Sequence, residues 1–214
     1  MTNARKTNAN AVKMSDSCTS SLPIEEHPLQ PFLPENARIL MLGSFPPKKE
    51  RWCMDFFYPN FINDMWRIFG VVFFADKNHF IVEGEKRFDY DKVTTFCRER
   101  GVAIYDTACA VRRLKDNASD KFLEVVRQTD VAALLAQLPQ CRAVIVTGQK
   151  AAETLAARFG CAVPAVGESV PFRANVAGRE LRLWRMPSSS RAYPLALEKK
   201  VEAYRKMFVQ NFDL

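Results

Sequence analysis

The fold is decided by the stretch Arg38-Ile39-Leu40-Met41-Leu42-Gly43-Ser44-Phe45-Pro46-Pro47. Its first five residues form a short apolar run, which is typical of a strand buried on both faces of a sheet. Gly43 ends this run, and the two prolines keep the next residues out of both sheet and helix. Ser44 is therefore expected in a stiff loop at the carboxyl end of a central strand, the edge at which open α/β sheets bind ligands.

Strands and helices are expected to alternate after this loop. Apolar runs predict strands at 102–105 and 143–146 and a hairpin of 170–175 with 180–185. Helices are expected at 62–69 with Gly70 as the stop, at 89–100, 131–138, 149–159 and 195–208, and through Phe122, Val125 and Val126, whereas 71–87 reads as irregular. This alternation predicts an α/β fold, a three-layer α/β/α sandwich around a mainly parallel sheet of four strands.

The composition indicates one folded domain behind a polar lead. The first 26 residues lack an apolar segment, so 1–26 is expected to be a disordered tail rather than a signal peptide, with 27–214 as a single domain. No apolar window is long enough for a membrane span. The six cysteines form no Cys-x-x-Cys pair, which suggests a reducing, cytoplasmic setting, nucleoid-associated in a bacterium.

Residue counts narrow the chemistry. With only His27 and His79, a multi-histidine metal site or a His-based triad is nearly excluded. The phosphate-loop and Gly-x-Gly-x-x-Gly patterns are absent and there are eight glycines, so neither a metal nor a nucleotide cofactor is expected. A net charge of +7 favours a polyanionic partner, nucleic acid first, although an ordinary basic soluble protein has the same balance.

Each predicted central strand ends in a cluster of small or polar residues. These clusters are Gly43-Ser44-Phe45-Pro46, Asp106-Thr107, Thr147-Gly148-Gln149-Lys150 and Pro187-Ser188-Ser189-Ser190-Arg191. Because the carboxyl ends of parallel strands meet at one edge of a sheet, the four loops should rim a single pocket.

In order and spacing, these motifs resemble the uracil-DNA glycosylase superfamily, nearest its mismatch-specific (thymine/uracil) and hypoxanthine-DNA glycosylase branches. Gly43-Ser44-Phe45-Pro46 is similar to the first motif of the family, Gly-x-x-Pro. Tyr58-Pro59-Asn60-Phe61-Ile62-Asn63-Asp64-Met65-Trp66 is similar to an aromatic-Pro stretch ending Asn-x-Phe-Trp. Thr147-Gly148-Gln149-Lys150-Ala151 fits the third strand and helix start, and Pro187-Ser188-Ser189-Ser190 the closing Pro-Ser-x-Ser motif.

The resemblance spans 37–208 and implies a function. The family contains DNA glycosylases that hydrolyse the N-glycosidic bond of a flipped, damaged base, as a step of base-excision repair. For this chain it implies a monofunctional enzyme acting on uracil or hypoxanthine in DNA, without cofactor or metal, and we expect a monomer. Base flipping costs a few kcal/mol, so the base must be held by stacking and by hydrogen bonds to its edge.

The same resemblance assigns roles to the base-facing residues. Asn63 would place the attacking water, and Ser44 would offer its hydroxyl and nearby backbone N–H to the base or the water. Base-binding roles fall on Tyr58, Asp106, Phe45 and Gly43, with Tyr58 stacking on the base and Asp106 accepting from its N–H. A full negative charge on Asp106 would oppose an anionic leaving base, which requires either a protonated carboxyl or a purine that leaves protonated.

Each of these residues also has an ordinary structural interpretation. Tyr58 and Ser44 could be plain loop residues, Asn63 could satisfy the first backbone donors of a helix, and Asp106 could cap a helix beginning at Thr107. DNA phosphates would be held by Gln149 and Lys150 at a helix start, by the closing motif Ser188, Ser189, Ser190 and Arg191, and by Arg112 with Arg113 and Lys115. The last three could equally form a solvated charged face.

Two positions depart from the family pattern. Phe45 stands where the classical uracil and mismatch enzymes have Asp or Asn, and Met186 stands where the final motif opens with His or Asn. Catalysis would therefore rest on Asn63. These departures leave two alternatives open, a catalytically inactive nucleic-acid-binding protein of the same fold and a hydrolase of small nucleosides.

Overall fold

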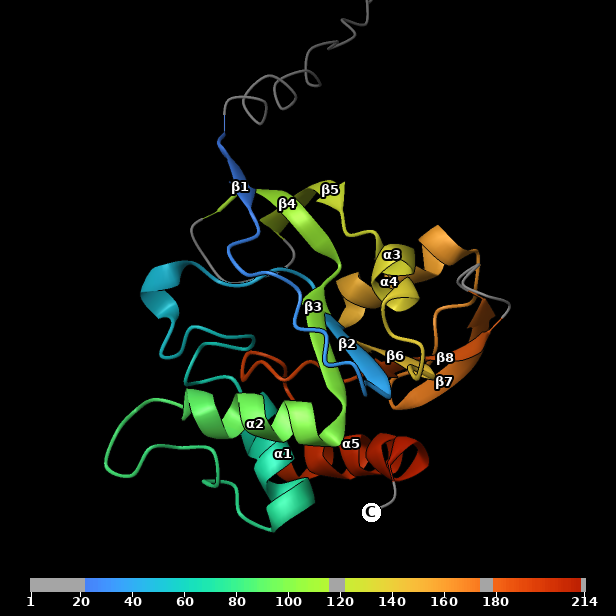
Figure 1. Ribbon diagram of the computed structural model, residues 1–214. Coiled ribbons are helices and arrows are strands. Elements are labelled where there is room, and N and C mark those ends of the chain that lie inside the picture. Colours follow the sequence, from blue (N-terminus) through green and yellow to red (C-terminus); the bar gives the residue numbers. More distant parts are fainter. Residues whose placement is uncertain (1–21, 116–121, 174–178, 213–214) are drawn as a thin grey trace, which may run out of the picture.

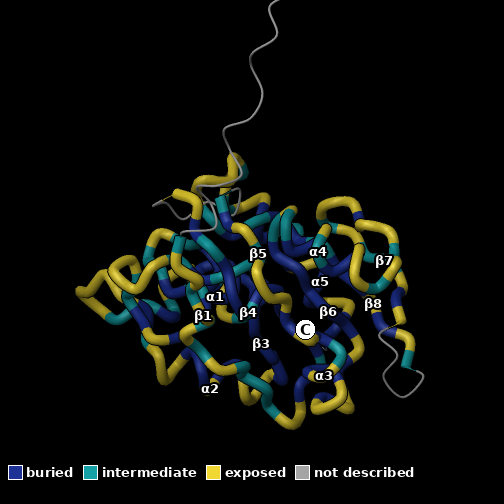
Figure 2. The backbone as a smooth tube through the Cα atoms, turned by 90° about the horizontal axis from the view of Figure 1, so that it is seen from above, coloured by how far each residue is buried: buried dark blue, intermediate teal, exposed yellow. Residues whose placement is uncertain are grey.

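The structure, a computed structural model, describes residues 22–115, 122–173 and 179–212. Its centre is a five-stranded sheet with the strand order β3-β2-β6-β8-β7. The strands β2 (Ile39–Gly43), β3 (Val102–Asp106), β6 (Ala143–Thr147) and β8 (Glu180–Met186) are parallel, and β7 (Glu168–Arg173) pairs antiparallel with β8. Every residue of β2 and β3 is buried (Figure 2), which is why these strands read as continuous apolar runs.

Helices lie on both sides of this sheet (Figure 1). The helices α1 (Met65–Phe74), α2 (Tyr90–Arg100) and α5 (Leu197–Asn211) lie on one side, and α3 (Val131–Ala136) and α4 (Gln149–Phe159) lie on the other. Right-handed crossovers require this division, because the chain moves outward from β2 to β3 and then back past β2 to β6 and β8. The expected α/β class and mainly parallel sheet are confirmed. The expected number of four strands is too low, since β7 of the predicted hairpin adds a fifth.

A second, antiparallel sheet stands at the carboxyl edge of the first and has the order β1-β4-β5. It consists of β1 (Ile24–Glu26), β4 (Ala108–Arg113) and β5 (Leu123–Gln128). The helix expected through Phe122, Val125 and Val126 is therefore wrong. Val125 packs on Ala108, Val111 and Leu123 while Val126 is 40% exposed, the alternation of a strand with one buried face.

The N-terminal boundary also differs from the expectation. Residues 24–26 were expected in the disordered tail, but they form β1 and pair with 110–112 of β4. The following segment runs along the edge of β3, where Phe32 and Ile104 exchange backbone hydrogen bonds of 3.0 and 2.9 Å. The remainder of the expected tail, 1–21, lies outside the described residues.

Gly70 does not end α1, as the sequence suggested, but lies inside it. A Cβ atom at this position would lie 2.3 Å from the Asp76 carbonyl oxygen, so glycine is required by the close approach of the chain after the helix. The helix ends instead at Ala75, which has a left-handed φ of 56°. The helix begins at Met65, so Ile62 lies before it and is 56% exposed.

The other helices agree with the sequence analysis to within a few residues. Asp89 and Asp130 cap α2 and α3 by accepting from the backbone N–H groups of Lys92 and Ala133. A single 3-10 turn, η2 (Lys49–Arg51), lies in the loop between β2 and α1. Within the described ranges, no helix has the length and apolar character that crossing a membrane requires.

Candidate active site

The four parallel strands end at one edge of the large sheet. The register pairs Gly43 of β2 with Asp106 of β3, and Thr147 of β6 with Met186 of β8. The Asp106 carboxylate lies directly over Gly43, because a Cβ atom there would be 2.3 Å from Asp106 Oδ1 and 3.9 Å from Thr147 Oγ1. Any side chain at position 43 would displace this carboxylate, which explains the glycine in the first motif.

Tyr58 reaches the same point from the loop before α1. Its phenol oxygen lies 3.3 Å from Thr147 Oγ1, and its φ of 51° is in the left-handed region that a non-glycine residue rarely adopts. Burial raises the pKa of Tyr58 well above its ordinary value, and the charge of Asp106 raises it further. The phenol is therefore protonated at neutral pH and is a hydrogen-bond donor beside Asp106.

Asp106 has a partner that the sequence analysis did not assign. His27 Nε2 lies 2.9 Å from Asp106 Oδ2, and the two side chains are only 2% and 10% exposed. No helix follows Asp106 for it to cap, since the chain continues directly into β4 and the Thr107 N–H donates to the Gly43 carbonyl. The capping alternative for Asp106 is thus wrong, and its carboxylate belongs to the rim.

The first loop closes against the small sheet. Phe45 packs with the cluster of Ala108, Val111 and Leu123, and its ring meets the His27 ring edge-on at 5.3 Å. The Ser44 carbonyl accepts from the Ala108 N–H at 3.2 Å. The position at which classical relatives carry an acid or amide is thus filled by a ring that contributes to packing and shields His27.

Asn63 lies beside the closing motif. It forms an isolated β-bridge with Ser190, and its side-chain Oδ1 accepts the Met65 N–H at 2.9 Å. The amide oxygen therefore satisfies a backbone donor at the start of α1, as the structural interpretation expected. This contact also fixes the orientation of the amide group next to the closing motif.

A buried ion-pair network anchors this closing motif. Asp64 accepts from Lys200 Nζ and from Arg191 Nε, both at 2.9 Å, and its own N–H donates to the Ser189 carbonyl. Lys200 is 1% exposed and also donates to the Ser190 carbonyl. The sequence analysis missed both Asp64 and Lys200. A signal was present, because Lys200 shares the apolar face of α5 with Leu197, Val201 and Tyr204 at helical spacing.

The predicted phosphate-binding residues divide into two groups. Ser188, Ser189, Ser190 and Arg191 lie on the rim, with the Ser188 Cβ 3.9 Å from where a Cβ on Gly148 would stand. Gln149 and Lys150 begin α4 as expected, but Gln149 hydrogen-bonds to Glu153 and Arg185, and Lys150 donates to the Leu123 carbonyl. Arg112 lies in β4, where it pairs with Glu124 at 3.2 Å.

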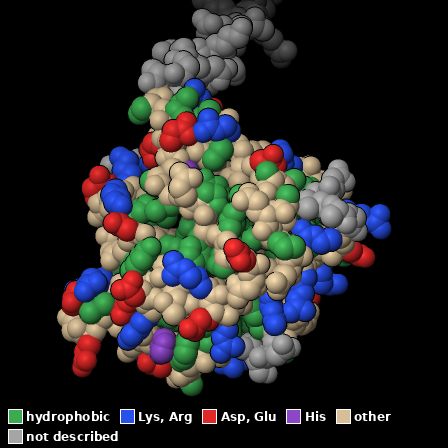
Figure 3. Space-filling model, in the orientation of Figure 1, with side chains coloured by type: hydrophobic (Ala, Val, Ile, Leu, Met, Phe, Trp, Pro, Cys, Tyr) green, Lys and Arg blue, Asp and Glu red, His purple; other side chains and the backbone are tan. Residues whose placement is uncertain are grey.

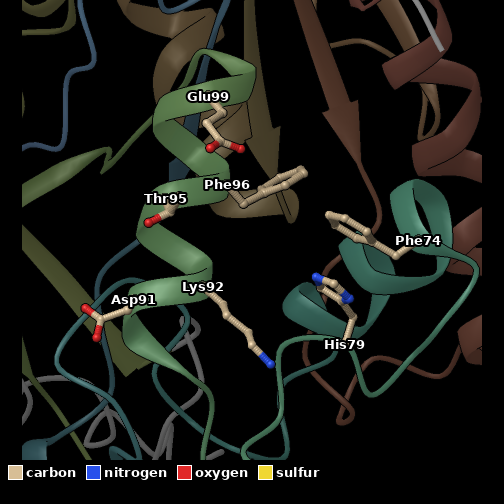
Figure 4. Close-up of a pocket in the computed structure, with 7 residues that line it drawn as sticks. All are labelled: Phe74, His79, Asp91, Lys92, Thr95, Phe96 and Glu99. Carbon is tan, nitrogen blue, oxygen red and sulfur yellow. The ribbon is translucent and has the colours of Figure 1, made fainter.

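Two hollows lie near the surface. The first is lined by Phe74, His79, Asp91, Lys92, Thr95, Phe96 and Glu99 (Figure 4), and none of these residues follows a strand of the large sheet. In it the His79 ring stacks on Phe74 with a centroid distance of 3.6 Å. The second adjoins the rim through Phe45, and its further lining includes Lys48, Lys49, Trp52 and Arg113. Among the described residues, no cluster of three or more His, Cys, Asp or Glu side chains suits a metal ion.

The structure thus brings Tyr58, Asp106, Gly43 and Ser188 to one rim, with Asn63 joined to it through Ser190. A carboxylate oxygen, two hydroxyl groups and a backbone glycine surround the point above β2. Such a set can form hydrogen bonds to a planar polar ligand. The exposed face in Figure 3 has hydrophobic side chains at its centre, with basic and acidic side chains interspersed around them.

Comparison with known proteins supports the fold. No protein-family model matches the sequence, and no curated protein does either. Among solved structures, the chain is similar to a candidate uracil DNA glycosylase from Methanosarcina acetivorans determined in solution by NMR, with a TM-score of 0.55. The two sequences are 22% identical, and the match covers 87% of this chain and 99% of that one. At this identity the likeness shows a shared fold.

Proposed function

We propose that this protein is a monofunctional DNA glycosylase that removes a deaminated base, uracil or hypoxanthine, from DNA. The observation that carries the proposal is the Asp106 carboxylate over Gly43, next to the hydroxyl groups of Thr147 and Tyr58. The proposed partner is DNA, bound by a monomer formed from 27–214 in the cytoplasm, without a metal or cofactor. The shared fold and the motif order support this proposal.

The chemistry of deamination explains why this set of groups would suit such a base. Deamination replaces a ring nitrogen acceptor beside an amino group with an N–H beside a carbonyl, in uracil and in hypoxanthine alike. Asp106 Oδ1 would accept from this N–H, and a neighbouring hydroxyl would donate to the carbonyl. Because the Tyr58 phenol is protonated, it can donate to Thr147 and leave the Thr147 proton for the base. Cytosine and adenine would present the opposite pattern.

Asn63 would place the attacking water. Its Oδ1 is committed to the Met65 N–H, so the amide nitrogen is the group proposed to orient the water. Hydrolysis then breaks the bond between the sugar C1′ and the base, with water supplying the hydroxyl on C1′ and a proton accompanying the base. Ser44 would support the base or the water from the first loop, and Tyr58 would stack on the flipped base.

The DNA strand would cross the rim between two anchor points. One is the closing motif Ser188–Arg191, which the Asp64 and Lys200 network fixes in place. The other is the start of α4, where backbone N–H groups face outward and Lys150 would exchange the Leu123 carbonyl for a phosphate. Arg112 is a weaker candidate because it pairs with Glu124 in the small sheet.

A base-release assay tests the proposal. Duplexes with a single deoxyuridine or deoxyinosine are incubated with the protein, and abasic sites are cleaved with alkali. We expect strand cleavage with at least one of these duplexes and none with the unmodified control. Release of neither base would reject the proposed activity.

The second candidate is a nucleic-acid-binding protein of this fold without catalysis. It is favoured by Phe45, which packs into the small-sheet cluster, and by Met186, which is fully buried. This candidate predicts DNA binding that weakens steeply with salt, without release of either base. The same samples, measured by fluorescence anisotropy at several salt concentrations, separate the two.

A further inference from the structure

His27 lies outside every motif of the proposed site and yet contacts its base-reading carboxylate. We infer that His27 is a positioning residue, whose Nε2–H holds Asp106 Oδ2 and so keeps the other oxygen, Oδ1, over Gly43 for the base. Nε2 and Oδ2 are 2.9 Å apart, and Oδ1 lies on the Gly43 side of the carboxylate. This inference rests on the proposed function for the role of Asp106, whereas the contact itself does not.

The protein builds a support that brings His27 to this position. β1 pairs with β4 in the register Glu25 to Val111 and Glu26 to Ala110, and the His27 N–H continues the ladder by donating to the Cys109 carbonyl at 2.9 Å. Arg113 of β4 holds Glu25 through contacts of 2.9 and 3.1 Å. The backbone at His27 is therefore fixed relative to the end of β3, where Asp106 lies.

The hydrogen bonds of the ring decide which nitrogen carries the proton. Nδ1 lies 3.1 Å from the Leu29 nitrogen and 2.9 Å from the Leu29 oxygen. In the neutral ring Nδ1 can accept from the Leu29 N–H, which leaves the proton on Nε2; in the charged ring both nitrogens donate. Nε2 therefore donates to an ionised Asp106 in both forms, since the remaining tautomer would place two lone pairs face to face.

The surroundings of the ring show that it acts through Asp106 rather than on DNA. Tyr105, Phe45 and Phe57 surround the imidazole at centroid distances of 4.5, 5.3 and 6.1 Å, and the side chain is 2% exposed. An ion or water has little access to the pair, so the carboxylate oxygen bound to His27 has no competing donor from solvent. Asp106 is thereby held in one rotamer, with one oxygen committed and the other directed to the rim.

The decisive variants separate the hydrogen bond from the volume of the ring. H27Q can keep a donor near the position of Nε2, whereas H27F keeps a planar ring and removes the donor. We expect H27F to lower the single-turnover rate of base release by about 10- to 100-fold, the range for a hydrogen bond to a charged group, and H27Q to restore much of it. The dissociation constant for duplex DNA should be unchanged in both, because His27 does not reach phosphate.

Two controls give the result its meaning. H79Q removes the other histidine, which stacks on Phe74 away from the strand ends, and should release base at the wild-type rate. In a D106N background, H27F should cause little further loss of rate, because its effect passes through the carboxylate. Equal rate losses for H27F with and without D106N, or failure of H27Q to exceed H27F, would overturn the inference.

A measurement on the free protein tests the contact independently of activity. In a 15N-labelled sample, the His27 Nε2 proton should exchange slowly with water, and this signal should disappear or shift strongly in D106A while H79Q retains it. If the wild-type protein releases neither base but this dependence holds, the proposed function fails and the positioning contact stands. A His27 signal that is unchanged in D106A would overturn the contact.

Discussion

Asp64 and Asp106 are both buried carboxylates at the rim, and they differ in how completely the protein satisfies them. Asp64 has both oxygens occupied, one by Lys200 and one by Arg191, each at 2.9 Å. For Asp106, the hydrogen bond at 2.9 Å involves Oδ2 and His27, while Oδ1 lies over Gly43. The difference separates a carboxylate that holds loops together from one that presents an oxygen to a ligand.

The contrast teaches that burial and charge alone do not mark a functional carboxylate. Asp64 is 5% and Asp106 is 7% exposed, so accessibility does not distinguish them. The partners do: Asp64 receives two cationic donors from the closing motif and α5, and thereby fixes the loop after β8. Asp106 receives one imidazole and stands beside hydroxyl groups. We therefore expect their substitutions to separate stability from activity.

The largest effect is expected for D64A on stability. Removing the carboxylate leaves the Lys200 ammonium buried without its counter-ion, which typically costs about 3–5 kcal/mol. Urea unfolding of D64A and wild type measures the loss. Replacing both partners, in D64L/K200M, should recover part of it.

Its control is D55A, which removes a carboxylate that pairs with Lys49 but is 76% exposed. This variant should change the free energy of unfolding by roughly 0–1 kcal/mol. A D64A protein as stable as D55A would erase the structural half of the comparison.

D106N is expected to have the opposite profile. The amide oxygen can still accept from His27 Nε2, so the free energy of unfolding should fall by only about 1 kcal/mol. The other arm becomes an NH2 donor in place of Oδ1 and would meet the N–H of the deaminated base. The single-turnover rate should therefore fall by roughly 100-fold, measured with the duplex that the wild-type protein cleaves best. Wild-type activity in D106N would remove Asp106 from the site.

A smaller effect is expected at Asn63, where capping and catalysis can be separated. N63A removes the oxygen that accepts from Met65 N–H and should cost about 1 kcal/mol of stability. N63D keeps an acceptor oxygen, so its unfolding curve should match the wild type within a few tenths of a kcal/mol, while base release is lost with the amide nitrogen. Normal activity in N63D would leave Asn63 as a helix cap only.

The smallest expected effect concerns the tyrosines beside Asp106. Burial raises the pKa of Tyr105 to about 12, and Cys109 and Asp106 raise it further, while Asp106 also raises the pKa of Tyr58. In an absorbance titration of tyrosinate, D106N should lower the pKa of these tyrosines by about half a unit, and D64N should leave them unchanged.

The same raised pKa predicts how stability depends on pH. An unfolded tyrosine loses its proton near the ordinary pKa of 10.0, whereas folded Tyr105 holds it to about 12. The contribution of neutral Tyr105 is therefore complete below pH 10 and is lost as the pH rises toward 12. Y105F should lose less stability than wild type between these two pH values, and an equal loss would show that Tyr105 does not titrate there.

The sequence alone was sufficient for the doubly buried strands and the capped helices. β2, β3 and β6 are continuous apolar runs, and α2 follows a capping aspartate and ends at a left-handed glycine, so each is encoded locally. β5 was mistaken for a helix because Phe122, Val125 and Val126 fit helical spacing as well, and only the pairing with β4 decides between the two. Gly70 reads as a helix stop, but the reason for it is the contact with Asp76.

The site was predictable to the extent that it follows strand ends. Gly43, Asp106 and Thr147 could be placed together because parallel strands share an edge. His27 could not, since its partner is 79 residues away and nothing near it in the sequence suggests a buried ring. The engagement of Lys150 with Leu123 was also beyond reach, because it depends on β5, whose structure was misread.

The support of His27 has a consequence for how the molecule assembles. The bond from His27 to Asp106 closes a loop of 79 residues, and those from Asp64 to Arg191 and Lys200 close loops of 127 and 136. Closing such long loops carries an entropic cost that later contacts must repay, so these bonds are expected late in folding. A nascent chain that has already formed α1 and α2 would still lack both ends of its rim, and competence for chemistry would arrive only when the last helix docks.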